Sequence, residues 1–564
     1  MGQYFIGLST SGHDPAFSIV DSNGVVLFAE ASERFMQTKR AWGIVPDHID
    51  HIAPHIEKLI KADPKATFHI STSWTRAKQN LGGDGESALA EPSTALVSLS
   101  LGRWMLGIQA QIHQNGGHSI RSVYQDYVPG STMNFDHHLC HATNGVYSAP
   151  FDDGLVLVAD GEGEVGSISL FRMKGRVLKR LWRSWGPGSL GAFYCWLTSL
   201  CGFSWVAGEE WKVMGLAAYG DPDMDLVEQL EKILVIENGR PVLADQSVID
   251  SVAKAVQVHQ RLPNEPVDNA ANLAATGQLV YQRYMHRIME SLKQYKEENL
   301  VLCGGCALNS SYNGSLLTDS LFKYVHVPSA PADDGNALGA ALLGWSKVSG
   351  VAEIPLLEGA CYLGSLPDPK VIEMAVKNSA WRSLKFQSDA PKKIAERLAE
   401  GRIIGVFRGA AEFGPRALGH RSILADPRSD SMKDTINMKV KGREPYRPFA
   451  PMILEEYQEE WFECSQNSPF MAFASRFREG KSKLIPAVVH ADNTGRLQTI
   501  SKDYEPWLHE LLTEFYRLTG VPVLLNTSFN VMGKPIVHSV QDAISVFGTT
   551  GLDGLLLEDT YFEK

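Results

Sequence analysis

The stretch "GLSTSGHDPAFSIVDSNGVVL" at residues 7–27 decides the fold, because "VADGEGEVGSISLFRMKGRVL" at residues 158–178 aligns with it without gaps. Each stretch begins with a polar loop after an apolar segment and then alternates apolar runs with a glycine turn, at Gly24 and Gly175. This pattern predicts strand, loop, strand, turn, strand. A repeated unit suggests a duplicated α/β domain with a cleft between its halves. Two hairpins that match by chance are the alternative.

Length and composition limit the classes of protein to which the chain can belong. The chain has 564 residues, of which 44% are apolar and 21% charged, enough for two or more domains. Its formal charge of −11 disfavours a nucleic-acid binder, whose affinity comes from Lys and Arg on phosphates. No apolar run reaches membrane-spanning length, the N-terminal residues do not resemble a leader, and the seven cysteines are scattered. We therefore expect a cytoplasmic protein with no membrane partner.

The segment "FDHHLCHATNGVYSAPF" contains three histidines within five residues. His137 and His141 are four residues apart, so a helix places both imidazoles on one face. Carboxylates that could complete a divalent metal site are Asp160, at the end of an apolar run, and Asp333 or Asp334, before a helix rich in small residues. Such a ligand set suits Fe(II), Mn(II) or Zn(II). The alternative is a hydrogen-bonded histidine in a buried helix and an aspartate that caps the next helix.

A glycine turn is expected in "ENLVLCGGCALNSSYNG". The segment predicts a buried strand, a turn at Gly304 and Gly305, and a helix start near Asn309. Glycines there allow backbone N–H groups to approach phosphates, and a helix N-terminus favours negative charge. Together with the repeat, this segment resembles the actin, sugar-kinase and heat-shock ATPase architecture, in which ATP lies in the cleft.

Arginines are concentrated in the second half, after a linker-like stretch at residues 350–369. Six lie in loops rich in Gly and Pro: Arg408, Arg416, Arg421, Arg428, Arg443 and Arg447. Arg496 follows, and the strand-like "GVPVLLNTSFN" ends in a polar loop with Ser528 and Asn530. Several guanidinium groups together indicate a small, highly charged anion. The alternative is that these arginines brace loops.

Seven motifs occur in an order that resembles one enzyme family: "HHLCHA", "EEWKVMGLAAYGDP", "GGCALN", "DDGNALGAAL", "EFGPRALGHRSILADPR", "KGREPYRPFAP" and "LLNTSFN". The chain resembles the ATP-dependent O-carbamoyltransferases of the NodU and CmcH type, which include tobramycin carbamoyltransferase. The resemblance implies a duplicated actin-like domain, similar to the tRNA threonylcarbamoyl transferase, at residues 1–352. A YrdC-like α/β domain that binds carbamoyl phosphate is implied at residues 353–564.

The resemblance also implies roles for individual residues. The metal ligands would be His137, His141, Asp160 and Asp333. ATP would lie near Lys39, Lys212, Gly304, Gly305 and Asn309. Carbamoyl phosphate would be held by Arg416, Lys441, Arg447, Arg496, Ser528 and Asn530. His13 would be the base that takes the proton of the acceptor hydroxyl.

The implied reaction joins carbamoyl phosphate and ATP into carbamoyl adenylate and then carbamoylates a hydroxyl of a small-molecule natural product. Fe(II) is the expected metal, with Mn(II) or Mg(II) as alternatives. A tRNA threonylcarbamoyl-type enzyme and an actin-like binding module are the rival interpretations. The acceptor and the oligomeric state stay open. Five tryptophans could line the acceptor pocket: Trp104, Trp182, Trp196, Trp205 and Trp211. The alternative is that they are core residues, which is the commoner position for tryptophan.

Overall fold

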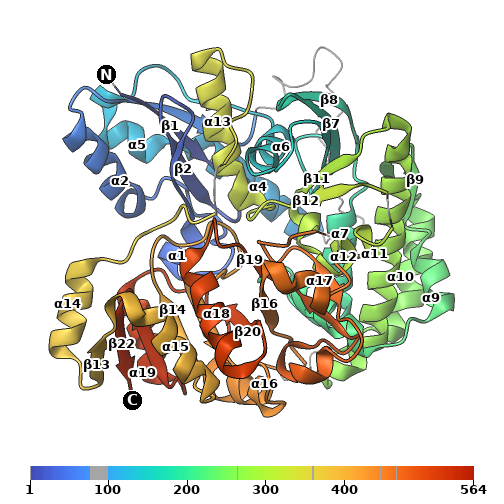
Figure 1. Cartoon of the computed structure of the whole chain (residues 1–564). Coiled ribbons are helices and arrows are strands. Elements are labelled where there is room, and N and C mark those ends of the chain that lie inside the picture. The colour runs from blue at the N-terminus through green and yellow to red at the C-terminus, as the bar shows by residue number, and fades with distance from the viewer. Residues whose placement is uncertain are drawn as a thin grey trace. The chain divides into compact units, whose positions relative to one another are not determined.

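The computed structural model describes residues 2–75, 99–262, 264–319, 321–357, 361–444, 446–464 and 466–564. The chain forms two compact units, which we call unit 1 and unit 2 (Figure 1). Unit 1 comprises Met1–Glu33, Arg40–Asn309 and Asp319–Leu357. Unit 2 comprises Arg34–Lys39, Ser310–Thr318 and Glu358–Lys564.

The two stretches that align in the sequence begin the two sheets of unit 1. The first sheet has the order β3-β2-β1-β4-β5, and the second has the order β12-β11-β6-β7-β8. In each, three antiparallel strands are followed outward by two parallel ones, so the predicted strand, loop, strand, turn, strand pattern is present twice. The first sheet consists of β1 Gln3–Leu8, β2 Ala16–Val20, β3 Val26–Ala31, β4 Thr67–Thr72 and β5 Met133–Asn134. The second consists of β6 Gly154–Ala159, β7 Ile168–Lys174, β8 Val177–Arg183, β11 Asn299–Cys303 and β12 Tyr324–His326.

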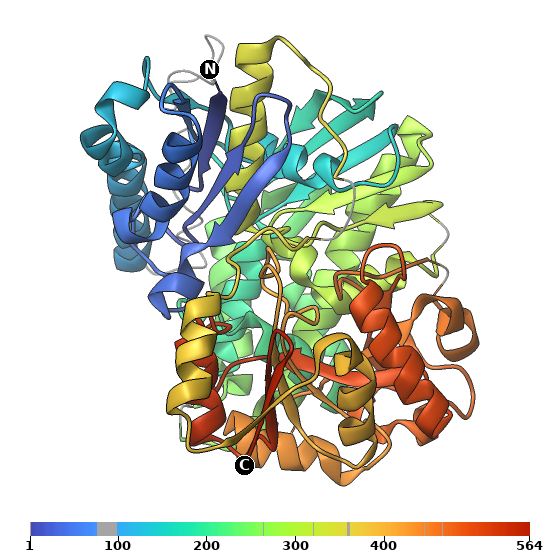
Figure 2. The same ribbon diagram turned by 60° about the vertical axis from the view of Figure 1, so that its left-hand side comes forward.

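Glycines allow the helix α13 (Asn336–Ser349) to pack closely in unit 1. A Cβ on Gly7 of β1 would lie 1.9 Å from the carbonyl oxygen of Ala337. A Cβ on Gly339 would lie 2.0 Å from the carbonyl oxygen of Cys140, in helix α6 (His137–Tyr147). Figures 1 and 2 show α13 between β1 and β2 on one side and α6 on the other. This close packing fixes the loop before α13 relative to α6.

Unit 1 contains further helices besides α6 and α13. They are α2 Ile49–Ala62, α4 Leu99–Asn115, α5 His118–Val123, α7 Leu190–Leu200, α8 Glu210–Leu216, α9 Met224–Leu230, α10 Gln246–Val256 and α11 Ala271–Leu292. A small hairpin joins β9 Leu234–Glu237 and β10 Arg240–Leu243. The short helix α1 (Ser32–Met36) runs from unit 1 into the segment that belongs to unit 2.

Unit 2 contains an eight-stranded mixed sheet in the order β13-β22-β21-β14-β15-β20-β16-β19. Its strands are β13 Arg382–Lys385, β14 Ile404–Phe407, β15 Arg421–Ala425, β16 Ala450–Leu454, β19 Gln498–Ile500, β20 Val523–Ser528, β21 Gly554–Leu557 and β22 Thr560–Glu563. A second, two-stranded sheet pairs β17 Ala474–Arg476 with β18 Thr494–Arg496. The other helices are α12 Ser310–Leu316, α14 Pro369–Asn378, α15 Ala390–Ala399, α16 Ser431–Ile436, α17 Gln458–Trp461, α18 Pro506–Thr519 and α19 Val540–Thr549.

Alternate residues of the large sheet pack on opposite faces, as the twofold period of a strand requires. In β15, Ile423 and Ala425 join the hydrophobic cluster that includes residues of α14, α16 and α19. Leu424, between them, joins the cluster formed with α15 and α18. Helices therefore cover both faces of the sheet, and both units are mixed α/β structures, which confirms the predicted α/β class.

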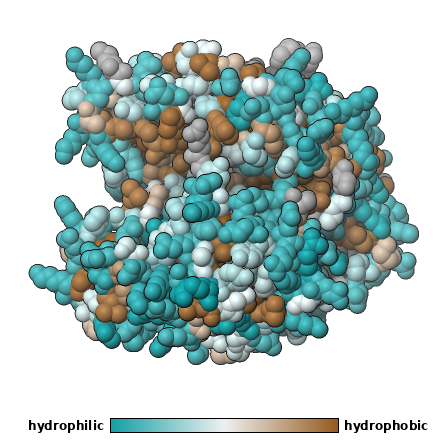
Figure 3. All heavy atoms as spheres, viewed as in Figure 1, coloured by the Kyte–Doolittle hydropathy of each residue, from teal (hydrophilic) through white to brown (hydrophobic). Residues whose placement is uncertain are grey.

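On the face drawn in Figure 3, hydrophilic residues cover most of the visible surface, with smaller hydrophobic patches between them. The exposed large hydrophobic side chains come from many different elements in both units. None of the helices in the described part of the chain combines the length and the hydropathy that crossing a bilayer requires.

Candidate functional site

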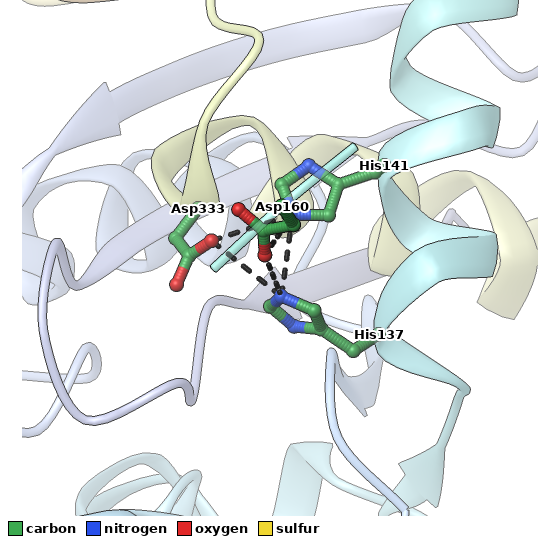
Figure 4. A group of neighbouring side chains, drawn as sticks. All are labelled: His137, His141, Asp160 and Asp333. Atoms are coloured by element: carbon green, nitrogen blue, oxygen red, sulfur yellow. Dashed lines mark hydrogen bonds and ion pairs between the residues drawn. The ribbon is translucent and has the colours of Figure 1, made fainter. Parts of the chain in front are cut away.

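Four buried side chains form a compact cluster in unit 1: His137, His141, Asp160 and Asp333 (Figure 4). The Nε2 atoms of the two histidines are 3.2 Å apart. Asp160 Oδ2 lies 3.1 Å from His137 Nε2 and 3.5 Å from His141 Nε2. Asp333 Oδ1 lies 3.5 Å and 3.3 Å from the same two nitrogens. One ligand atom from each residue thus lies within 4.8 Å of the other three, a spacing that one metal ion can bridge.

Three separate elements bring these side chains together. The helix α6 begins at His137, and its N-cap Asp136 accepts a hydrogen bond from the backbone N–H of Leu139 at 2.9 Å. Asp160 follows the last residue of β6, and its Oδ1 accepts from the backbone N–H of Gly305 at 2.8 Å. Asp333 lies in the single helical turn that precedes α13. The packing of α13 on α6 therefore sets the distance between Asp333 and the histidines.

The hydrogen bonds of His137 orient its ring for metal binding. Its Nδ1 lies 3.3 Å from the carbonyl oxygen of Ser73, to which a protonated Nδ1 donates. In that tautomer Nε2 carries the lone pair and faces the two carboxylates. His138 instead contacts Ser169 Oγ through Nδ1 at 2.8 Å, and burial lowers its pKa to about 3. His138 is therefore a neutral structural residue, and only two of the three histidines belong to the cluster.

The electrostatics of the cluster favour a bound cation. Burial alone would lower the pKa of His137, but the carboxylates of Asp333 and Asp160 outweigh it and raise this pKa well above its ordinary value. Burial would raise the pKa of Asp333, but His137 and His13 hold it well below its usual range. Two carboxylates thus face two imidazoles, and this set of two nitrogen and two oxygen donors fits Fe(II), Mn(II) or Zn(II). The donor chemistry does not choose between these ions.

His13 lies at the edge of the cluster. Its Nε2 is 3.7 Å from Asp333 Oδ2, and its Nδ1 is 2.9 Å from Asp14 Oδ2. The neighbouring Asp334 points elsewhere, since its Oδ1 accepts from the backbone N–H of Gly335 at 3.0 Å. Burial raises the pKa of Asp334 to about 7, and the charges of Asp14 and Glu33 add to the effect. Of the two aspartates in the "DDG" motif, Asp333 is the one in the cluster.

The residues expected near ATP are more dispersed. Gly304 has φ +89°, and a Cβ there would lie 2.3 Å from the carbonyl oxygen of Ala159, so only glycine fits this turn. The N–H of Gly304 donates to the carbonyl oxygen of Pro331, and that of Gly305 donates to Asp160. The amide of Asn309 exchanges two hydrogen bonds of 3.1 Å with Gln278. The glycine turn therefore lies beside the cluster and helps to position Asp160.

The two lysines expected near ATP lie in different places. Lys212 lies in α8, where its Nζ pairs with Glu209 Oε1 at 2.7 Å. Lys39 belongs to unit 2, and its charge lowers the pKa of Lys441 there, although burial of Lys441 has the larger effect. The structure thus associates Lys39 with the residues expected to bind carbamoyl phosphate.

Three of the residues expected to hold carbamoyl phosphate are in direct contact in unit 2. Lys441 ends the π-helical turn Asn437–Lys441, and its Nζ donates to Asn530 Oδ1 at 2.8 Å and to Ser528 Oγ at 3.3 Å. Ser528 Oγ also donates to Asn530 Oδ1 at 2.8 Å. Burial, followed by the charges of Arg443, Arg447 and Lys39, holds the pKa of Lys441 well below its ordinary value. A bound anion would offset both the loss of hydration of Lys441 and its repulsion by the neighbouring cations.

Arginines complete this cationic group. Burial, with the charges of Arg416, Arg443 and Arg447, holds the pKa of Arg496 well below its ordinary value. Burial also lowers the pKa of Arg416 to about 10 and, together with Arg447, that of Arg443 to about 9. We call the set the cationic cluster: Lys39, Arg416, Lys441, Arg443, Arg447 and Arg496. Glu444, 3.5 Å from Arg447, supplies one negative charge beside it.

Other arginines of the same sequence region brace the fold. Arg421 is fully buried in β15 and donates to the carbonyl oxygens of Arg408 at 2.7 Å and Ser365 at 2.7 Å. Arg428 forms an ion pair of 2.6 Å with Asp426. The alternative interpretation, that arginines brace loops, therefore describes Arg421 and Arg428. Arg443, which the sequence places in the same run without a role, lies in the cationic cluster.

Comparison with known proteins identifies the class. A family model described as "Carbamoyltransferase N-terminus" matches residues 116–342, and one described as "Carbamoyltransferase C-terminus" matches residues 395–564. The chain therefore belongs to the carbamoyltransferase family, as its motifs predict, and is a transferase.

Named relatives agree with this assignment. The nodulation protein NolO of Bradyrhizobium diazoefficiens is 37% identical over 75% of this chain and 77% of its own length. The 3'-hydroxymethylcephem-O-carbamoyltransferase of Amycolatopsis lactamdurans is 29% identical over 76% of this chain and 80% of its own length. Among solved structures, full-length HypF in its phosphate- and nucleotide-bound form has a TM-score of 0.35 and 12% identity, covering 62% of this chain and 56% of HypF.

Proposed function

We propose that this protein is an O-carbamoyltransferase that uses carbamoyl phosphate and ATP to form carbamoyl adenylate and then carbamoylates a hydroxyl of a small-molecule natural product. Given that the chain is a carbamoyltransferase, the proposal rests mainly on the cationic cluster of unit 2, in which the basic side chains outnumber the acidic side chain beside them. The relative named as a hydroxymethylcephem O-carbamoyltransferase supports a hydroxyl as the acceptor.

Unit 2 would bind carbamoyl phosphate. Arginine forks match phosphate oxygens in two-point geometry, so Arg416, Arg447 and Arg496 would hold the phosphate. Lys441 would neutralise the bridging oxygen, while Ser528 and Asn530 hydrogen-bond the carbamoyl group. Water then attacks the carbamoyl carbon, the bond from carbon to the phosphate oxygen breaks, and phosphate leaves as carbamate forms. In this proposal unit 2 is the YrdC-like domain.

Unit 1 would bind ATP as a duplicated actin-like domain, which its two sheets of equal strand order support. An oxygen of carbamate attacks the α-phosphorus of ATP, pyrophosphate leaves, and carbamoyl adenylate forms. His137, His141, Asp160 and Asp333 would hold a divalent ion, which neutralises the charge of the triphosphate. The glycine turn keeps Asp160 oriented through the N–H of Gly305.

His13 would act as the base in the transfer step. Its Nδ1 donates to Asp14, so the lone pair on Nε2 is free to accept the proton of the acceptor hydroxyl. The hydroxyl oxygen attacks the carbamoyl carbon, the bond to the adenylate oxygen breaks, and AMP leaves. Asp14 stabilises the imidazolium that results.

The direct test is release of AMP and pyrophosphate from ATP and carbamoyl phosphate, with Fe(II), Mn(II) or Mg(II) and without acceptor. We expect release that requires both substrates and is lost in His137→Ala. His138→Gln, on the same helix but outside the cluster, should keep it. AMP release that does not depend on carbamoyl phosphate, or no release with any of the three metals even when hydroxyl compounds are added, would refute the proposal.

A further inference from the structure

Three tryptophans form a wall beside His13 in unit 1. The ring of Trp42 packs on the imidazole of His13 with 4.7 Å between centroids and a tilt of 58°. The centroid of Trp104 lies 5.1 Å from that of Trp42, and the centroid of Trp205 lies 6.4 Å from it at 75°. Trp42 is thus the centre of an aromatic surface that begins at the proposed base. We call these three side chains the tryptophan wall.

Backbone hydrogen bonds fix the wall to the loop that carries His13. The N–H of Asp14 donates to the carbonyl oxygen of Arg40 at 2.8 Å, and the N–H of Gly43 donates to that of Gly12 at 3.0 Å. The indole N–H of Trp42 donates to the carbonyl oxygen of Val206 at 2.8 Å. The ring of Trp42 is therefore held in one orientation, with its polar edge already satisfied and part of its apolar surface exposed beside Trp104.

The loop is held in a costly conformation. Asp14, Arg40 and Ala41 have φ of +48°, +58° and +37°, in the left-handed region that L-residues avoid. This region is unfavourable for residues with a Cβ atom, although Asp is better tolerated there than most. Ala41 is 1% exposed, so its burial helps to hold the loop in place. A conformation of this kind at a proposed catalytic residue is typical of a functional constraint.

Charged groups beside the wall already have partners. Arg40 pairs with Glu210 at 2.8 Å and with Asp14 at 3.8 Å, and Asp14 also accepts from His13. An amine or a carboxylate on an acceptor would have to displace one of these internal pairs. An uncharged acceptor would displace no ion pair when it packs on the tryptophans, of which Trp104 is 41% exposed and Trp42 is half-buried.

We propose that the tryptophan wall is the specificity surface for the acceptor, and that it selects neutral acceptors which present an apolar face next to the reacting hydroxyl. The C–H face of a sugar ring and a planar ring share this chemistry. Stacking on Trp42 and Trp104 brings the acceptor beside the ring of His13, whose Nε2 takes the hydroxyl proton. This inference rests on the proposed function for its catalytic step but makes a binding prediction of its own.

Isothermal titration of the full chain with small probes tests the wall. Four probes compare the chemistries: phenyl β-D-glucopyranoside, methyl β-D-glucopyranoside, glucosamine and glucuronate. We expect phenyl glucoside to bind at least about tenfold more tightly than the two charged sugars, and Trp104→Ala to weaken it by about tenfold. Trp104→Phe should retain most of the affinity. Methyl glucoside that binds nearly as well as phenyl glucoside identifies a sugar face, and weaker binding identifies the planar ring.

The matched control is Trp185→Ala. Trp185 is another exposed tryptophan of unit 1, 51% exposed, which packs against Arg183. This variant should bind phenyl glucoside as the unsubstituted protein does, and an unchanged melting temperature of Trp104→Ala would show that its fold is intact. Tighter binding of a charged sugar, equal losses in both Ala variants, or no saturable binding of either neutral probe overturns the proposal. AMP release without acceptor, measured on the same preparation, reports separately on the proposed function.

Discussion

Removing one charge from the cationic cluster should stabilise the unliganded protein while it abolishes binding of the anion. Arg416 is the best position for this test, because it has no hydrogen bond or ion pair with any residue that the structure describes. Arg416→Met therefore removes a guanidinium without leaving a partner unpaired. In an ordinary buried ion pair the same substitution would be strongly destabilising, since it would leave the opposite charge buried without a partner.

The magnitude follows from the pKa of Arg416, which burial lowers from 12.5 to about 10. Each pKa unit corresponds to about 1.4 kcal/mol, so the shift corresponds to at most about 3.5 kcal/mol, and to roughly 1–3 kcal/mol once solvent screening is included. Arg416 is protonated in both the folded and the unfolded state at pH 7, so the full penalty acts there. It disappears only as the pH rises from about 10 towards 12.5.

The assay is thermal and urea unfolding with and without inorganic phosphate or carbamoyl phosphate. Without ligand, Arg416→Met should unfold at a temperature about 2–4 °C higher for each kcal/mol gained. In the unsubstituted protein, ligand at about 100 times its Kd should add about 2.7 kcal/mol of stability, and in Arg416→Met this gain should vanish. Arg428→Met, which breaks the pair with Asp426, should give no stabilisation and keep the response to phosphate. An Arg416→Met protein that is less stable and still responds to phosphate would refute the reasoning.

Three further outcomes are expected. His137→Ala should lose most of its bound divalent metal, measured by mass spectrometry of the purified protein, whereas His138→Gln should retain it. His13→Ala should slow transfer to an acceptor by roughly 100-fold or more, measured as carbamoylated product per AMP formed; an unchanged ratio would remove His13 from the base role. Gly304→Ala should lower the free energy of unfolding by more than about 2 kcal/mol, because its Cβ meets a carbonyl at 2.3 Å, while Gly350→Ala, with φ +78° and open space, should lose only about 1 kcal/mol.

The fold could be predicted from the sequence where local patterns repeat. Gly24 and Gly175 occupy equivalent turns, with φ of +82° and +52°, and the apolar runs around them form the predicted strands. The close packing of α13 was not predictable in this way. It depends on Gly7 and Gly339, which meet the backbone of other elements, and such long-range contacts leave no period in the sequence.

The candidate sites could be predicted only in part. The spacing of His137 and His141 correctly indicates that both face one point, but Asp333 and Asp334 are adjacent, and the residues alone left the choice between them open. Spacing also could not predict that Arg416 and Arg421 have different roles. They lie five residues apart, yet Arg421 begins a strand and donates to backbone oxygens, whereas Arg416 lies in the preceding loop within the cationic cluster. Their roles depend on which carbonyl groups surround each guanidinium in the folded chain.

The two clusters differ in how their charges are arranged. In unit 1 two carboxylates face two imidazoles, and despite burial this attraction raises the pKa of His137 and lowers that of Asp333, so a divalent cation would take the place of protons on the imidazoles. In unit 2, Lys441 and Arg496 are held below their ordinary pKa by burial and by cationic neighbours, a set that a dianion would complete. Since like charges held together destabilise the free protein, the affinity of the unit 2 site for an anion arises from repulsion that the anion removes. A substitution that neutralises part of the cationic cluster should therefore raise stability and lower activity together, whereas damage to the fold would lower both.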